Sequence, residues 1–155
     1  MSDPVQPPAA GRTNSYALYS AQGIVMGTIL GSLAAGVVML YLNYQALGRA
    51  GLARTIALWG IALFLTVIGI ASLVPNTALL ALLFMAIQAG IAYFLTEKLQ
   101  GAAIRYHREH GGPMHSNARA AMVGFLTGLA LFFLLIVGAT LFMTVTGTLP
   151  PPPAG

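Results

Sequence analysis

The sequence carries very little charge and has no cysteine. Only 6% of its 155 residues are charged, whereas 57% are hydrophobic. An ordinary soluble domain has about 25% charged residues, so this composition excludes that class. The absence of cysteine excludes disulfides, thiolate metal sites and a cysteine nucleophile.

Acidic residues are equally scarce. The chain has 3 Asp and Glu in total, and Glu97 and Glu109 lie on one polar arm between apolar stretches. No carboxylate pair and no Ser/His/Asp constellation can be built from these residues. We therefore expect no enzymatic activity, no catalytic residues and no cofactor. Because no ionisable residue lies within the apolar stretches, a proton-driven transporter is also disfavoured.

Long uncharged runs are abundant instead. They cover residues 22–43, 55–74, 77–96 and 120–145, and each approaches the ~20 apolar residues that a membrane-spanning helix needs. The sequence thus predicts an all-α protein, an integral membrane four-helix bundle with up-down-up-down topology. We expect this transmembrane domain over residues 21–145, between a flexible tail at 1–20 and a Pro-rich tail at 146–155. Residues 97–110 should form a cytoplasmic helical arm.

The basic residues gather in two of the expected connections. Six of the 7 Lys and Arg residues lie between the first and second runs or between the third and fourth, and Arg12 lies apart from them. The positive-inside rule places both connections in the cytoplasm. It predicts a multi-pass protein of the bacterial inner (plasma) membrane, N-out and C-out. These residues should meet anionic lipid at the cytoplasmic face, not nucleic acid: Arg49, Arg54, Lys98, Arg105, Arg108 and Arg119.

Small residues form stripes on two of the expected helices. Helices in a bilayer associate by close packing, which glycine permits. We expect the first stripe in the outer half of the membrane and the second in the inner half. The first would then face Phe132, Phe133 or Leu135 of the last helix, and the second would face Met39, Leu40 or Tyr41 of the first helix. These residues would either pack helices together within one bundle or form an oligomerisation face or pore lining, and the sequence is compatible with both roles. The helix-packing residues are Gly23, Gly27, Gly31, Ala35, Ala120, Gly124 and Gly128.

Polar side chains inside the runs are few. Gln88 is the deepest, and a single glutamine in a membrane helix is typical of an interhelical hydrogen bond. His107, His110 and His115 are the only cluster of metal-ligand type. Their spacing matches no zinc signature, so we interpret the segment as a basic interfacial loop and expect no metal. Metal binding by these three histidines is the alternative.

The segment "LYSAQGIVMGTILGSLAAGVVMLYLNYQALG" resembles a group of small, uncharacterised bacterial inner-membrane proteins. The shared pattern is LYS-x-Q, then LGS-x-A, then NY-x-x-LG. That group often has proline after the serine and after the Gly/Ser step, where this chain has Ala21 and Leu33; the difference argues against a kinked first helix. The resemblance implies no activity. It rests on these residues: Tyr19, Ser20, Gln22, Gly31, Ser32, Ala34, Asn43, Tyr44, Leu47 and Gly48.

These observations favour an integral membrane protein that serves as a structural or accessory subunit, in a larger membrane complex or as a homo-oligomer. The alternative is a small channel or transporter assembled as an oligomer through the face of Gly23, Gly27 and Gly31.

Overall fold

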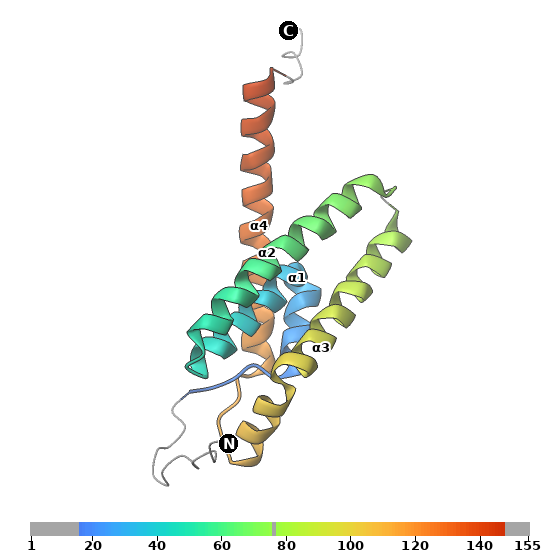
Figure 1. Ribbon diagram of the computed structural model, residues 1–155. Coiled ribbons are helices and arrows are strands. Elements are labelled where there is room, and N and C mark those ends of the chain that lie inside the picture. Colours follow the sequence, from blue (N-terminus) through green and yellow to red (C-terminus); the bar gives the residue numbers. More distant parts are fainter. Residues whose placement is uncertain (1–15, 76, 148–155) are drawn as a thin grey trace, which may run out of the picture.

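The computed structural model describes residues 16–75 and 77–147 as four helices (Figure 1). Each is long and apolar enough to cross a membrane, which confirms the all-α four-helix membrane fold. The expected N-terminal tail through residue 15, with Arg12, and the Pro-rich tail from residue 148 lie outside the described residues. The helices are α1 (Ala21–Ala46), α2 (Ala50–Leu73), α3 (Ala78–Glu109) and α4 (Asn117–Thr146).

Hydroxyl side chains begin three of the helices. Ser20, Thr77 and Ser116 each accept a hydrogen bond from a backbone N–H in the first turn of α1, α3 and α4. An N-cap oxygen of this kind satisfies a donor that has no partner within the helix. Gly147 ends α4 in the left-handed region, with φ 67°, where glycine is favoured.

Helix α1 is interrupted at its centre. Gly31 (φ −128°, ψ 17°) and Ser32 (φ 68°, ψ 178°) leave the helical conformation. The Ser32 combination lies in a region that is almost restricted to glycine and costs about 1–3 kcal/mol. Surrounding contacts must therefore hold it.

The two parts of α1 fold back on each other. The Tyr19 N–H donates to Asn43 Oδ1 at 2.7 Å, and Asn43 Nδ2 donates to the Tyr19 carbonyl at 2.9 Å. In a straight helix these residues would be about 36 Å apart at 1.5 Å per residue. Thus α1 is a helical hairpin whose arms are residues 21–30 and 33–46. The expectation of a straight first span is wrong.

The hairpin defines two ends of the molecule. The base holds Tyr19 and Asn43 together with the α1–α2 and α3–α4 connections, and the tip is the Gly31–Ser32 break (Figure 1). The first arm is about 15 Å long, half of the ~30 Å hydrocarbon layer. Helices α2, α3 and α4 continue past the tip, so these three traverse the full length and α1 does not.

Helix α1 is the core around which the others are arranged. Of its most apolar 18-residue stretch 56% is buried, compared with 6%, 6% and 11% in α2, α3 and α4. Each of those three helices packs against α1, and among the described helices none packs against another of the three. Beyond the tip α4 diverges from α2 and α3, whose far ends are joined by a short connection (Figure 1).

The small residues of α1 and α4 meet each other. A Cβ added at Gly124 would lie 2.7 Å from Gly27 Cα, and one at Gly23 would lie 3.2 Å from Ala120 Cβ. The expectation that the first stripe faces Phe132 or Phe133 is wrong because the first arm of α1 and α4 both start at the base and run side by side. The large side chain that Gly27 meets is Met39 of the second arm. Phe132 and Phe133 are 58% and 57% exposed.

The hairpin can be tested by disulfide cross-linking, because the chain has no cysteine of its own. A Cβ at Gly36 would lie 2.5 Å from Thr28 Oγ1, whereas these positions would be about 12 Å apart in a straight helix. We expect Thr28→Cys with Gly36→Cys to form an intramolecular disulfide in membranes, seen by mass spectrometry after oxidation. Leu126→Cys with Leu134→Cys, equally spaced on α4, should not. Failure of the first pair to cross-link would rule out the hairpin.

Candidate functional site at the helical hairpin

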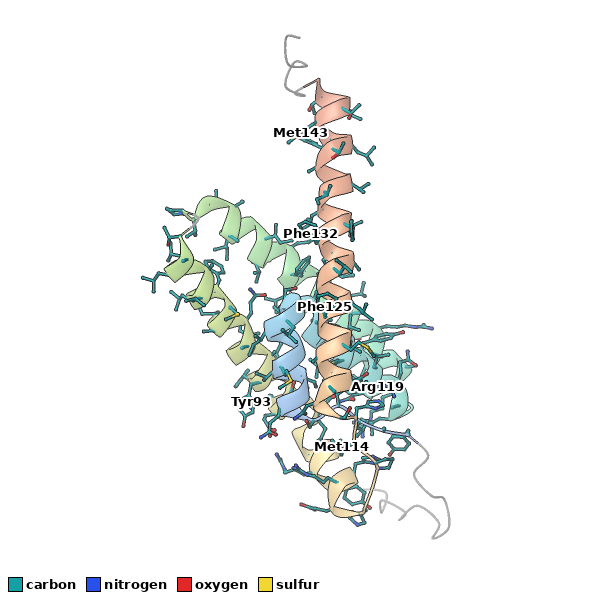
Figure 2. The ribbon with its side chains drawn as sticks, turned by 180° about the vertical axis from the view of Figure 1, so that it is seen from behind. Tyr93, Met114, Arg119, Phe125, Phe132 and Met143 are labelled. Carbon is teal, nitrogen blue, oxygen red and sulfur yellow. The ribbon has the colours of Figure 1, made fainter. Side chains whose placement is uncertain are left out.

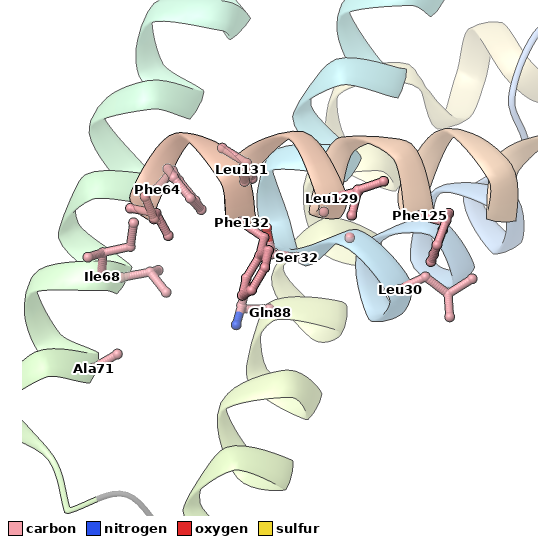
Figure 3. Close-up of a pocket in the computed structure, with 14 residues that line it drawn as sticks. Leu30, Ser32, Phe64, Ile68, Ala71, Gln88, Phe125, Leu129, Leu131 and Phe132 are labelled. Atoms are coloured by element: carbon pink, nitrogen blue, oxygen red, sulfur yellow. The ribbon is translucent and has the colours of Figure 1, made fainter. Parts of the chain in front are cut away.

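The tip of the hairpin opens into a cavity of about 550 Å³, here called the tip pocket. It lies among α1, α2, α3 and α4 near the middle of their length. Figure 3 shows aromatic and aliphatic side chains around it, and Ser32 and Gln88 are the polar side chains in its lining. Such a lining suits an apolar occupant.

Gln88 connects α3 to the break in α1. Its Oε1 accepts a hydrogen bond from the Leu33 N–H at 2.9 Å, and the Ser32 hydroxyl accepts one from the Ala34 N–H at 3.4 Å. Non-helical backbone at membrane depth is tolerated only where its polar groups are satisfied. The prediction that Gln88 makes an interhelical hydrogen bond is confirmed.

Two buried amide side chains, Asn43 and Gln100, form a polar cluster at the base of the hairpin. In addition to its bond with the Tyr19 carbonyl, Asn43 Nδ2 donates a hydrogen bond to Gln100 Oε1 at 2.9 Å, and Gln100 Nε2 donates one to the Leu40 carbonyl at 2.8 Å. Asn43 and Gln100 are each 1% exposed. Gln100 thereby ties the second arm to α3, and Asn43 ties the residue before the first arm to the second arm.

The segment before α1 pairs with the α3–α4 connection. The Leu18 N–H donates to the Pro113 carbonyl at 3.3 Å, and the Leu18 carbonyl accepts from the His115 N–H at 2.9 Å. His107 is 2% exposed and its Nε2 lies 3.0 Å from the same Pro113 carbonyl. Nε2 therefore carries the proton, and Nδ1 is buried without a partner in the described residues.

The ring of each of the three histidines lies against that of a different tyrosine, stacked for His107 and tilted for His110 and His115. The ring centroids lie 4.8 Å apart for His107 and Tyr16, 4.0 Å for His110 and Tyr106, and 4.3 Å for His115 and Tyr19. Burial, and then the nearby Arg119, lower the pKa of His115. Among residues 16–75 and 77–147, no group of three or more His, Asp or Glu side chains is placed to hold a metal ion.

The basic residues lie toward the base (Figures 1 and 2). Arg49 and Arg54 flank the start of α2, Lys98, Arg105 and Arg108 lie on the last turns of α3, and Arg119 lies in the first turn of α4. Arg105 Nη1 forms an ion pair with Glu97 Oε2 at 2.7 Å. Apart from this pair, the described structure shows no ion pair for these six side chains.

Sequence reasoning named Gln88 and Asn43 but missed Gln100, the partner of Asn43 at the base. Gln100 lies beside Glu97 and Lys98 in the expected polar arm, so its sequence context gave no signal that it is buried. Comparison of the chain with protein-family models, with curated proteins and with solved structures finds no match.

The Gln88 contact yields a stability test. Gln88→Leu leaves the Leu33 N–H unpaired, which should destabilise the fold by about 1–3 kcal/mol, measured by unfolding in detergent. Thr66→Val is the control because that hydroxyl bonds only to the Ala62 carbonyl of its own helix, and it should change stability by less than about 0.5 kcal/mol.

A second substitution at Leu33 identifies the cause of the loss. Proline has no N–H and is tolerated at the first helical position, so Leu33→Pro in the Gln88→Leu background should recover part of the lost stability. Equal stability of Gln88→Leu and Thr66→Val would show that the Gln88 bond does not hold the break.

Proposed function

We propose that this membrane protein is a structural or accessory subunit of a larger complex in the bacterial inner membrane. The observation that carries the proposal is the divergence of α4 from the α2–α3 pair beyond the tip (Figure 1), which leaves an open apolar space that the described residues do not fill. Large apolar side chains are exposed there, among them Phe132, which lines the tip pocket and is 58% exposed, and Leu134, which is 66% exposed. A transmembrane helix of another subunit fits such a surface.

The polar groups of these diverging segments need no water. The hydroxyls of Thr66, Thr140 and Thr144 each donate to a carbonyl four residues earlier in the same helix. Such segments can face lipid or another apolar helix with equal ease. The polar side chains that line the cavities along these segments are few: Ser32 and Gln88 at the tip, and Ser72 and Thr77 between the far ends of α2 and α3.

A channel or transporter is the second candidate. An interrupted helix at mid-membrane depth is a feature of transporter binding sites, and the Gly31–Ser32 break with Gln88 beside it is the observation in favour. Assembly through Gly23, Gly27 and Gly31 has no support, because α4 of the same chain packs on that face.

For orientation we propose N-in and C-out. The N-out expectation counted α1 as a crossing, whereas the hairpin returns to the base, so residues 16–20 lie at the same end as the basic connections. The positive-inside rule then puts the base in the cytoplasm. Anionic lipid of that leaflet is the expected partner of the basic residues. The resemblance to small inner-membrane proteins fits this proposal, since Tyr19, Ser32 and Asn43 of the shared pattern form the hairpin.

Two reporters test the orientation. A fluorescent protein that matures only in the cytoplasm, fused at the N-terminus, and a phosphatase active only outside it, fused after Gly147, should both be active. A straight first span with the same C-terminal location would silence the N-terminal reporter. Activity of the phosphatase with a silent fluorescent protein would therefore contradict the hairpin topology.

The accessory role is tested by site-specific photo-cross-linking in cells. A photoreactive residue in place of Phe132, which lines the tip pocket, should give one defined adduct with another membrane protein. The same residue at Leu58, which is 70% exposed and does not line that pocket, should give lipid adducts. Lipid adducts at both positions, together with solute flux through the purified chain in liposomes, would instead establish the channel or transporter.

A further inference from the structure

Two adjoining cavities lie between the first arm of α1 and α3. The first, about 170 Å³, lies at the base and includes Arg105, Arg108, Glu97 and the start of α1 in its lining. The second, about 590 Å³, is lined by Val25, Met26, Ile29 and Leu30. Gln22 and Tyr93 line both, so the two cavities adjoin at these residues.

The basal cavity is suited to an anion. Arg108 has no partner among the described residues, and Arg105, with its side chain 53% exposed, bonds Glu97 through Nη1 only. Two arginines and one glutamate leave a net charge of +1, and guanidinium groups bind phosphate through charge-assisted hydrogen bonds. Ala21 and Gln22, in the first turn of α1, also line this cavity, and their backbone N–H groups have no partner within the helix.

The second cavity is suited to a hydrocarbon chain. Its lining beyond Gln22 and Tyr93 is aliphatic or thioether, and it runs along the first arm of α1 from near the base to Leu30, next to the tip. That arm is about 15 Å long, which corresponds to one leaflet of the ~30 Å hydrocarbon core. The length of the groove therefore matches an acyl chain.

We propose that this surface, the basal cavity and the apolar groove together, holds one anionic phospholipid. Its phosphate lies between Arg105 and Arg108, and one acyl chain lies along Val25, Met26 and Ile29. The inference rests on the anionic-lipid contact proposed above and names its site. It distinguishes a bound lipid from the diffuse attraction that all basic residues exert on an anionic leaflet.

The test counts lipids that remain on the purified full chain. The protein is placed in nanodiscs of equal phosphatidylglycerol and phosphatidylcholine with the same acyl chains, transferred to detergent and examined by native mass spectrometry. We expect one retained phosphatidylglycerol. The double variant Arg105→Gln with Arg108→Gln should lower its retention about tenfold. Arg49→Gln with Arg54→Gln, with the same loss of charge away from the cavity, should leave retention unchanged.

Two further variants distinguish the contribution of the headgroup site from that of the acyl-chain groove. Glu97→Gln removes the competing carboxylate and should raise retention, whereas Met26→Trp narrows the groove without changing charge and should lower it. The disulfide between Thr28→Cys and Gly36→Cys, introduced into each variant, reports that the hairpin is intact. A structural loss would abolish this disulfide as well.

Three results would overturn the proposal. An equal loss of phosphatidylglycerol retention in the Arg105/Arg108 and Arg49/Arg54 double variants would show diffuse attraction. Equal retention of phosphatidylglycerol and phosphatidylcholine would show that there is no anion site. Displacement of the lipid by millimolar glycerol phosphate would show a site for a free phosphate compound. None of these measurements needs a partner subunit, so their failure leaves the accessory role untouched, and a failed search for a partner leaves the lipid site untouched.

Discussion

The structure depends on keeping the backbone of α1 hydrogen-bonded where its helix is broken inside the membrane. Each unpaired peptide group there costs several kcal/mol because lipid offers no partner. Gln88 pairs with the Leu33 N–H at the tip, and Asn43 pairs with both backbone groups of Tyr19 at the base. Two amide side chains thus make it possible for an apolar segment to enter the membrane and return to the same side.

The hairpin in turn decides how the other helices are arranged. Because α1 reaches only half of the hydrocarbon thickness, it can hold α2, α3 and α4 together near the base but not beyond the tip. Close contact with α4 is possible because Gly27, Gly31 and Gly124 bring the two backbones together. The same shortness leaves the space beyond the tip open, and it is this space that the proposed partner helix would fill.

The presence of four apolar helices could be predicted from the sequence, because about 20 uncharged residues are a local property. The path of α1 could not. Residues 22–43 are long enough to cross, and the bonds that fold them back join Asn43 to a residue 24 positions away and Leu33 to one 55 positions away. Helical periodicity reports only neighbours three or four residues apart. The spacing of Gly23, Gly27 and Gly31 indicated a close-packed face, but which residues meet it follows from the path of the chain.

The order in which the chain is synthesised gives the hairpin a further consequence. Gly31 and Ser32 emerge from the ribosome well before Gln88 and Gly124, the residues that pair with the break and pack beside it. Until α3 and α4 have been made, the interrupted backbone has no partner except water. The first segment of the chain to be made therefore gains its tip contacts only after α3 and α4 have been translated, so the hairpin is completed late although its residues come first.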